Sequence, residues 1–165
     1  MHKKSRWMSC SMKLAQTQLD FFLQKSTDTH LDFDLDLVKE QSKNPVYYVQ
    51  YAGARMHSIL KKSQTLNLKS QINFKNPNIQ EKNLILKLIQ FPEIIEDIAK
   101  DYQVQRLTTY AYELAKVFTD FYEKVPVLKA ETEDLKKSRL NLVFNTRKIL
   151  NQVLGLLGIS APEKM

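Results

Sequence analysis

Tyrosines and cations follow one line through a segment that the sequence predicts to be helical. Tyr48, Tyr51, Arg55, Ser58 and Lys62 stand at offsets of 0, 3, 7, 10 and 14, so they share one face of an α-helix. Flat phenol rings can stack on unpaired bases, while arginine and lysine bind the phosphates between those bases. This face therefore has the chemistry of a surface for single-stranded RNA.

A plainer interpretation of the same face stays open. Tyrosines often cover the flank of a helical bundle with their rings half-buried and their hydroxyl groups in water. On composition alone, this structural interpretation is the stronger of the two.

The net charge of +7 is concentrated in two blocks of the chain. Residues 45–76 contain five lysines and arginines and no acid. The second block is C-terminal and contains Lys136, Lys137, Arg139, Arg147 and Lys148. Clustered cations without matching acids suit a phosphate backbone, although a single run of charge is more often a solvated face.

Composition excludes several classes of protein. A chain of 165 residues with 43% hydrophobic and 26% charged residues suits one globular domain. Cys10 is the single cysteine, so no internal disulfide can form and a reducing compartment is expected. His2, His30 and His57 lack zinc-ligand spacing, and no metal site is expected. With no membrane-length apolar run and no signal-like start, we expect a cytoplasmic protein without membrane contact.

Helices are favoured because the chain has three glycines and five prolines, too few for many tight turns. The Asn44-Pro45 pair predicts a helix over residues 45–63, with Asn44 as its N-cap. Residues 64–78 are rich in polar side chains and predict a loop. Pro92 predicts two short helices, residues 84–90 and 92–101, separated by a break.

Two further helices follow from apolar periodicity. Between residues 103 and 123, apolar side chains recur every three or four positions, at Leu107, Tyr110, Leu114, Val117 and Phe121. The last helix is expected to begin near Thr132, to carry acids in its first turn and to end around Gly155 or Gly158. The fold class is therefore all-α, a helical bundle.

Two patterns leave alternatives open. Residues 30–37, HLDFDLDL, alternate polar and apolar side chains, which fits an extended segment or a short helix about equally; a cation site on the aspartates is the less favoured interpretation. In the last helix, leucine or isoleucine recurs every seven residues, which could indicate a coiled-coil dimer. Additional apolar residues broaden that stripe, so we favour the core of one monomeric bundle.

Several motifs in order resemble the C-terminal part of arginyl-tRNA synthetase. They are THLDFDLDL (29–37), NPVYYVQYAGAR (44–55), RLTTYAYELAKVFTDFYEKVPVL (106–128) and SRLNLVFNTRKILNQVLGLLGISAPEKM (138–165). The resemblance implies a DALR anticodon-binding helical domain over residues 28–165, of the kind found in class Ia aminoacyl-tRNA synthetases. Residues 1–27 match poorly and are interpreted as a remnant of the connection to a catalytic domain.

The resemblance also implies a set of RNA contacts. In the family, anticodon bases meet aromatic residues of the tyrosine-rich helix, a tyrosine of the FY motif and the C-terminal methionine. By position these are Tyr48 and Tyr51, Tyr122, and Met165. Tyr122 has a competing role as a core residue beside Phe118 and Phe121. The expected backbone cations are Arg55, Lys62, Arg139 and Arg147.

Departures from the family pattern bear on activity. Gly53 stands where many members have histidine. A glycine inside a helix lowers its stability and would allow another helix to approach closely. No HIGH-type motif is present, and Met8-Ser9-Cys10-Ser11 lacks the lysines of a KMSKS motif. The resemblance therefore implies a non-catalytic part of a ligase that attaches arginine to its tRNA, with ATP and magnesium used by the full-length enzyme. The expected partners are arginine tRNA and the catalytic domain; the alternative is a stand-alone helical module that binds RNA or protein.

Overall fold

The computed structural model describes residues 45–63, 74 and 76–165. These residues form four helices: α3 (Pro45–Ser63), α4 (Ile79–Asp101), α5 (Gln105–Lys124) and α6 (Glu133–Leu156). The described part of the chain contains no strand, which confirms the all-α prediction. Asn44, the segment of residues 30–37, residues 1–27 and most of the predicted loop of residues 64–78 lie outside the described residues.

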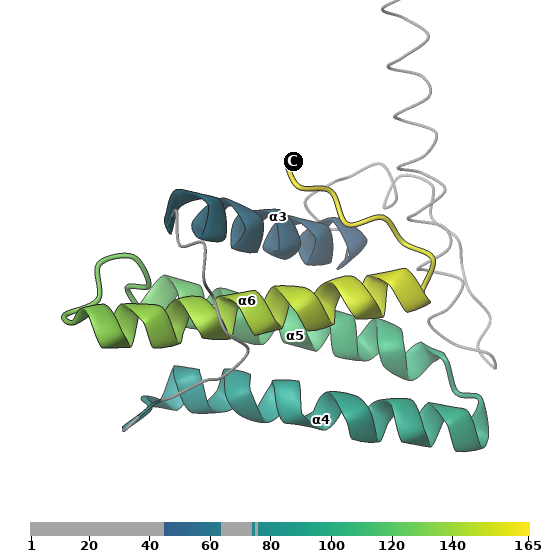
Figure 1. Ribbon diagram of the computed structural model, residues 1–165. Helices are drawn as coiled ribbons and strands as arrows, with labels where there is room; N and C mark the ends of the chain where they lie inside the picture. The colour runs from purple at the N-terminus through teal and green to yellow at the C-terminus, as the bar shows by residue number, and fades with distance from the viewer. Residues whose placement is uncertain (1–44, 64–73, 75) are drawn as a thin grey trace, which may run out of the picture.

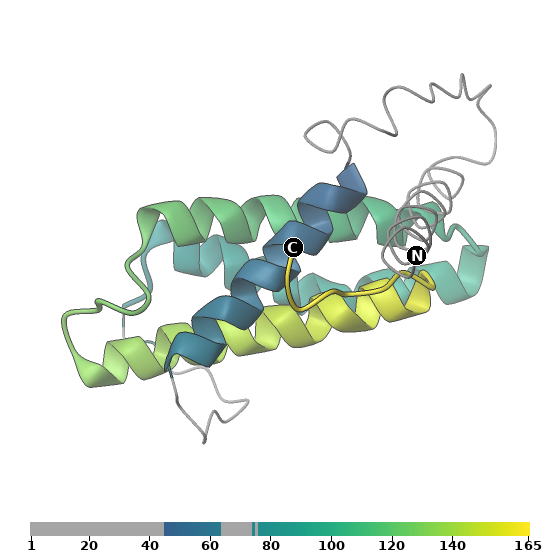
Figure 2. The same cartoon turned by 90° about the horizontal axis from the view of Figure 1, so that it is seen from above.

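The helices are arranged in three levels (Figure 1). α5 and α6 lie between α3 on one side and α4 on the other, and both contact each of these outer helices. Seen from above, α3 crosses over α5 and α6 instead of running parallel to them (Figure 2). One side of α3 is therefore left facing away from the bundle.

α3 begins and ends where the sequence predicts, at Pro45 and Ser63. Its other side faces the core, where Val49, Met56 and Ile59 are buried. Gly53 is buried as well, but a methyl group at that position would lie 3.7 Å from Cδ2 of Leu150, an ordinary contact distance. The approach of α3 to α6 therefore does not require glycine.

α4 is one continuous helix, so the predicted break at Pro92 is wrong. It also begins earlier than predicted: Asn78 Oδ1 accepts a hydrogen bond from the Glu81 amide, and the Glu81 carboxylate accepts one from the Asn78 amide, each at 2.8 Å. An interior proline costs about 3 kcal/mol. Apolar residues on both sides of Pro92, among them Leu88 and Ile95, pack against the core, and each buried side chain returns about 1.5–3 kcal/mol. Burial of this face therefore outweighs the missing hydrogen bond.

α5 supplies the aromatic centre of the core. Tyr110, Phe118 and Phe121 are almost completely buried, and the predicted apolar stripe is confirmed. The Tyr110 hydroxyl donates a hydrogen bond of 2.9 Å to the carbonyl of Lys87 in α4, so its polar end is satisfied inside the core. Burial raises the pKa of the Tyr110 phenol.

α6 closes the bundle and agrees with its predicted limits. Thr132 is the N-cap, its hydroxyl oxygen accepts a hydrogen bond from the Leu135 amide at 3.2 Å, and Glu133 and Asp134 occupy the first turn. Its broad apolar stripe packs within this bundle: Leu142, Val143, Leu150, Val153 and Leu154 are all buried. Among the four described helices, none combines the length and the low polarity that a bilayer-spanning helix needs.

Candidate nucleic-acid interface

The outward-facing side of α3 carries a pair of tyrosines, of which Tyr51 is exposed and Tyr47 is half-buried. Tyr51 is 45% exposed, and the Tyr47 ring stacks near it, with centroids 6.3 Å apart and 18° between the planes. Nη1 of Arg55 lies 3.4 Å from the Tyr51 hydroxyl oxygen, to which it donates a hydrogen bond. Two parallel rings with a guanidinium at their edge form a platform on which a base can stack.

Tyr48 has a different environment from Tyr51. Its side chain is half-buried and packs against the core. Its ring lies 5.6 Å from the Tyr112 ring of α5 at an angle of 48°. Tyr48 thus joins α3 to α5, and Tyr112, which is 43% exposed, continues the aromatic surface beside it.

Arg55 and Tyr122 connect α3 to the end of α5. The guanidinium carbon of Arg55 lies 4.5 Å from the centre of the Tyr122 ring, a cation–π distance. The Tyr122 ring also stacks on Phe118, with centroids 6.2 Å apart and 24° between the planes. Tyr122 therefore packs on the core, as one of the two roles considered for it requires, and its contact with RNA stays a prediction.

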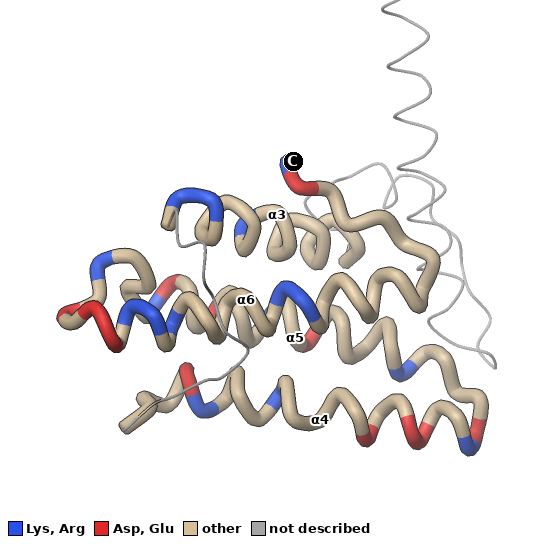
Figure 3. The backbone as a smooth tube through the Cα atoms, in the orientation of Figure 1, with Lys and Arg blue, Asp and Glu red and all other residues tan. Residues whose placement is uncertain are grey.

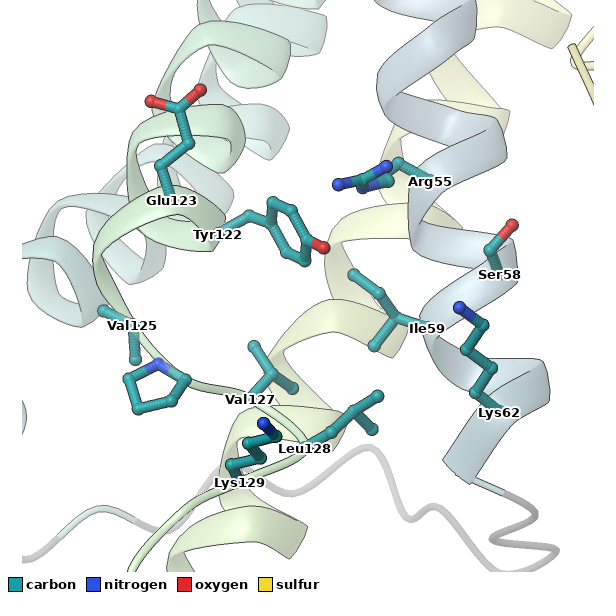
Figure 4. Close-up of a pocket in the computed structure, with 11 residues that line it drawn as sticks. Arg55, Ser58, Ile59, Lys62, Tyr122, Glu123, Val125, Val127, Leu128 and Lys129 are labelled. Carbon is teal, nitrogen blue, oxygen red and sulfur yellow. The ribbon is translucent and has the colours of Figure 1, made fainter.

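A groove of roughly 600 Å³ opens beside this contact (Figure 4). One wall is α3, with Arg55, Ser58 and Lys62; the other is the loop of residues 125–129, which ends in Lys129. Apolar side chains line the space between the walls: Ile59, Val125, Pro126, Val127 and Leu128.

The groove is electropositive. Three cations line it, against one carboxylate, that of Glu123. Within the described part of the chain, neither Lys62 nor Lys129 has an acidic side chain within salt-bridge distance. The groove fits a nucleotide. Its apolar side chains and aromatic rim can contact a base, and its ammonium groups can bind a phosphate.

The surrounding charge is mixed. Figure 3 shows cations at the end of α3 and, at the same end of the bundle, in the loop before α6 and in the first turns of α6. The acids of that loop and of the first turn of α6, Glu131, Glu133 and Asp134, lie among them. The favourable field for a phosphate is therefore local to the groove.

The C-terminal tail lies against α3. Nε2 of Gln50 donates a 2.7 Å hydrogen bond to the Ser160 carbonyl, and Nδ1 of His57 lies 3.1 Å from the Glu163 carbonyl oxygen. Arg147 reaches the Glu163 carboxylate at 3.9 Å. Both views place the chain end above α3, on the side away from α5 and α6 (Figures 1 and 2). Met165, 48% exposed, is thus brought to the helix that carries Tyr51.

Arg139 lies apart from this surface. It is 8% exposed, its Nε donates to the Glu81 carboxylate at 2.7 Å, and its Nη1 donates to the Pro126 carbonyl at 3.0 Å. A guanidinium that is itself buried and paired with a buried carboxylate is not available to a phosphate. We therefore replace the expected backbone contact of Arg139 with a structural role.

Three residues of this surface are absent from the sequence-based set. Tyr47 could have been found, because it stands four positions before Tyr51 and such pairs meet on a helix. Tyr112 and Lys129 belong to other elements, and no local spacing indicates that they approach α3. Their inclusion depends on how the helices pack.

The chain is similar in sequence to known ligases. A model of the DALR anticodon binding domain matches residues 49–165. Arginine–tRNA ligase 2 of Bacillus thuringiensis subsp. konkukian is 42% identical over 149 residues, and the enzyme of Bacillus subtilis is 41% identical over the same length. Each alignment covers 88% of this chain, and the chain spans 27% of the length of these relatives.

Solved structures agree with the sequence comparisons. Arginyl-tRNA synthetase of Thermus thermophilus superposes with a TM-score of 0.80 at 31% identity, covering 93% of this chain and 27% of that one. The Plasmodium falciparum enzyme gives a TM-score of 0.79 at 29% identity, covering 95% and 28%. The fold described above is therefore similar to one part of these larger proteins.

Proposed function

Because the chain belongs to the DALR anticodon-binding domain family, we propose that it binds the anticodon loop of arginine tRNA as part of an arginine–tRNA ligase. The observation that carries the proposal is the exposed surface of α3, where Tyr51 and Arg55 stand beside the electropositive groove. Unstacked loop bases are the usual targets of such surfaces.

The proposed RNA surface assigns a role to each of its residues. Tyr51, with Tyr47 behind it, stacks on a base, and Tyr122 with Arg55 forms the rim against which a second base can lie. Lys62 and Lys129 bind phosphates from opposite walls of the groove. Tyr48 supports this surface from within, and Arg147 holds the tail that presents Met165.

The full reaction is proposed to need more than this domain. ATP, with magnesium, would be used by a catalytic domain to activate arginine, and this chain carries neither of the two class I signature motifs. We propose that the anticodon-binding unit spans residues 28–165 and acts in the cytoplasm as a monomer next to that catalytic domain.

A second candidate is a module that binds another protein. Ile79, Leu86 and Ile89 of α4 are 61%, 58% and 66% exposed, on the helix farthest from α3. Exposed apolar side chains grouped on one helix are typical of a surface that another polypeptide covers. This candidate predicts protein binding through α4 and no preference for any RNA.

The deciding experiment compares two RNAs with one protein. The 165-residue chain is titrated with arginine tRNA and with the same tRNA altered only in its anticodon, and Tyr51→Ala is measured beside the parent. We expect tighter binding of the unaltered tRNA and a loss of that preference in the variant. Equal binding of both tRNAs by the parent would reject the proposal.

A further inference from the structure

A buried ion pair joins α4 to α6 behind the groove. Nε of Arg139 lies 2.7 Å from Oε1 of Glu81, and the two side chains are 10% and 1% exposed. A pair so deeply buried loses most of its hydration, so its geometry and additional hydrogen bonds decide whether it is tolerated. These additional bonds show what the pair connects.

Each member of the pair has a further hydrogen-bond partner. Oε2 of Glu81 accepts a 2.8 Å hydrogen bond from the amide of Asn78, the N-cap of α4. Nη1 of Arg139 donates a 3.0 Å bond to the carbonyl of Pro126. One pair therefore joins the start of α4, the body of α6 and the loop after α5.

That loop is the second wall of the groove. Residues 125–129 all line it, opposite α3 (Figure 4). No helical ladder fixes the carbonyl groups there, because α5 ends at Lys124 and α6 begins at Glu133. The Arg139 guanidinium supplies a fixed donor to this wall from the interior of the bundle.

We infer that Arg139 is a positioning residue for RNA binding: with Glu81, it holds the loop of residues 125–129 at the distance from α3 that the groove requires. The inference rests on the proposed function and adds a residue that contacts no RNA. Lys129 then faces Lys62 across the groove because a buried guanidinium, 13 positions along the chain from Pro126, fixes the wall that carries it.

Arginine is needed at this position for a geometric reason. Its guanidinium has separate nitrogen donors in a planar fork, and here two of them bond partners on different segments. A lysine could pair with Glu81 through its one ammonium group, but it could not reproduce the fixed angle to the Pro126 carbonyl. Arg139→Lys therefore keeps the charge and loosens the wall.

The test measures affinity and loop order in the same proteins. Arg139→Lys is compared with the parent and with Lys148→Arg, a charge-conserving control at an exposed position of α6. Each chain is titrated with an anticodon stem–loop RNA of arginine tRNA, and amide hydrogen exchange is followed at residues 127–129. Thermal unfolding of each chain shows whether it is folded at the temperature of the RNA titration.

We expect Arg139→Lys to bind the RNA roughly five- to tenfold more weakly while it remains folded, with faster exchange confined to the loop. A second variant, Glu81→Gln with Arg139→Met, removes the buried charges while glutamine preserves the capping box; it should show the same two effects.

Two results would contradict the inference, and they are distinguishable. If the parent binds and Arg139→Lys binds equally well with unchanged exchange in the loop, Arg139 does not position the wall. If the parent itself does not bind the stem–loop, the proposed function fails, and the role of Arg139 in RNA binding fails with it.

Discussion

The guanidinium carbon of Arg55 lies 4.5 Å from the centre of the Tyr122 ring, so a residue of α3 and a residue of α5 that are 67 positions apart meet at the rim of the groove. A cation above an aromatic face is stabilised by about 0.5–1 kcal/mol at an exposed site. The contact also keeps the guanidinium extended toward the groove, where it can stack or donate hydrogen bonds to an RNA. Tertiary packing has thus brought together, from two helices, a cation and a ring that we propose as part of the RNA surface.

Removing the exposed ring of α3 should weaken RNA binding without unfolding the protein. Stacking contributes about 1–3 kcal/mol per base, so Tyr51→Ala should raise the Kd for arginine tRNA by roughly 5- to 150-fold. Tyr51→Phe keeps the ring and should bind almost as the parent does. Fluorescence anisotropy at constant salt measures both.

Tyr102 offers a matched control for the tyrosine experiment. It is 83% exposed and lies at the C-cap of α4 with a φ of 58°, a conformation that asparagine also tolerates. Tyr102→Asn removes a ring that is more exposed than that of Tyr51 and should leave the Kd unchanged. A similar loss in both variants would indicate non-specific contacts rather than a base-stacking site.

The two lysines that face each other across the groove, Lys62 and Lys129, should contribute to the salt dependence of RNA binding. Each phosphate contact to single-stranded RNA contributes about 0.7 to the slope of log K against log salt, so Lys62→Gln or Lys129→Gln should reduce that slope by roughly this amount. The measurement is a titration series at several salt concentrations. Lys100→Gln, at an exposed position of α4, is the control. An unchanged slope in both groove variants would place the phosphates elsewhere.

Gly53→Ala should stabilise the protein. Glycine in a helix interior costs about 1 kcal/mol relative to alanine, and the added methyl would meet Leu150 at 3.7 Å, without a clash. Urea unfolding followed by circular dichroism should show a higher midpoint with an unchanged slope. A lower midpoint would mean that α3 and α6 are packed too tightly for the methyl.

The protein should lose stability at alkaline pH because the Tyr110 phenol is buried. Burial raises the pKa of its phenol in the folded state, while the unfolded chain ionises near its ordinary value of about 10. The folded protein therefore keeps this proton up to a higher pH than the unfolded chain does. The free energy of unfolding falls as the pH rises above about 10, by up to about 1.4 kcal/mol per pH unit.

Tyr110→Phe isolates this contribution. The variant loses the hydrogen bond to the Lys87 carbonyl and should be less stable than the parent by about 0.5–1.5 kcal/mol at neutral pH. The difference between the two proteins should shrink above about pH 10, because phenylalanine does not ionise. Urea unfolding at several pH values tests this, and a constant difference across that range would contradict the proton linkage.

Local sequence signals determined most of the secondary structure. The Asn44-Pro45 pair predicted the start of α3, the apolar period predicted α5, and Thr132 with the acids that follow it predicted the start of α6. Pro92 was misleading, because the local cost of an interior proline is outweighed by the apolar surface that α4 buries on either side of it. That burial depends on α5 and is not a property of the proline or its neighbours.

The sequence by itself also determined the composition of the candidate surface on α3, since residues three, four and seven apart share a helix face whatever the rest of the chain does. Only the tertiary structure decided which of the candidate cations lie at the groove and which are buried against other helices. Lys62 faces the groove, whereas Arg139 bonds Glu81, 58 positions away, and the Pro126 carbonyl. The physical reason is that helix periodicity is a local property of the chain, whereas the burial of a charge depends on partners that folding brings from other helices.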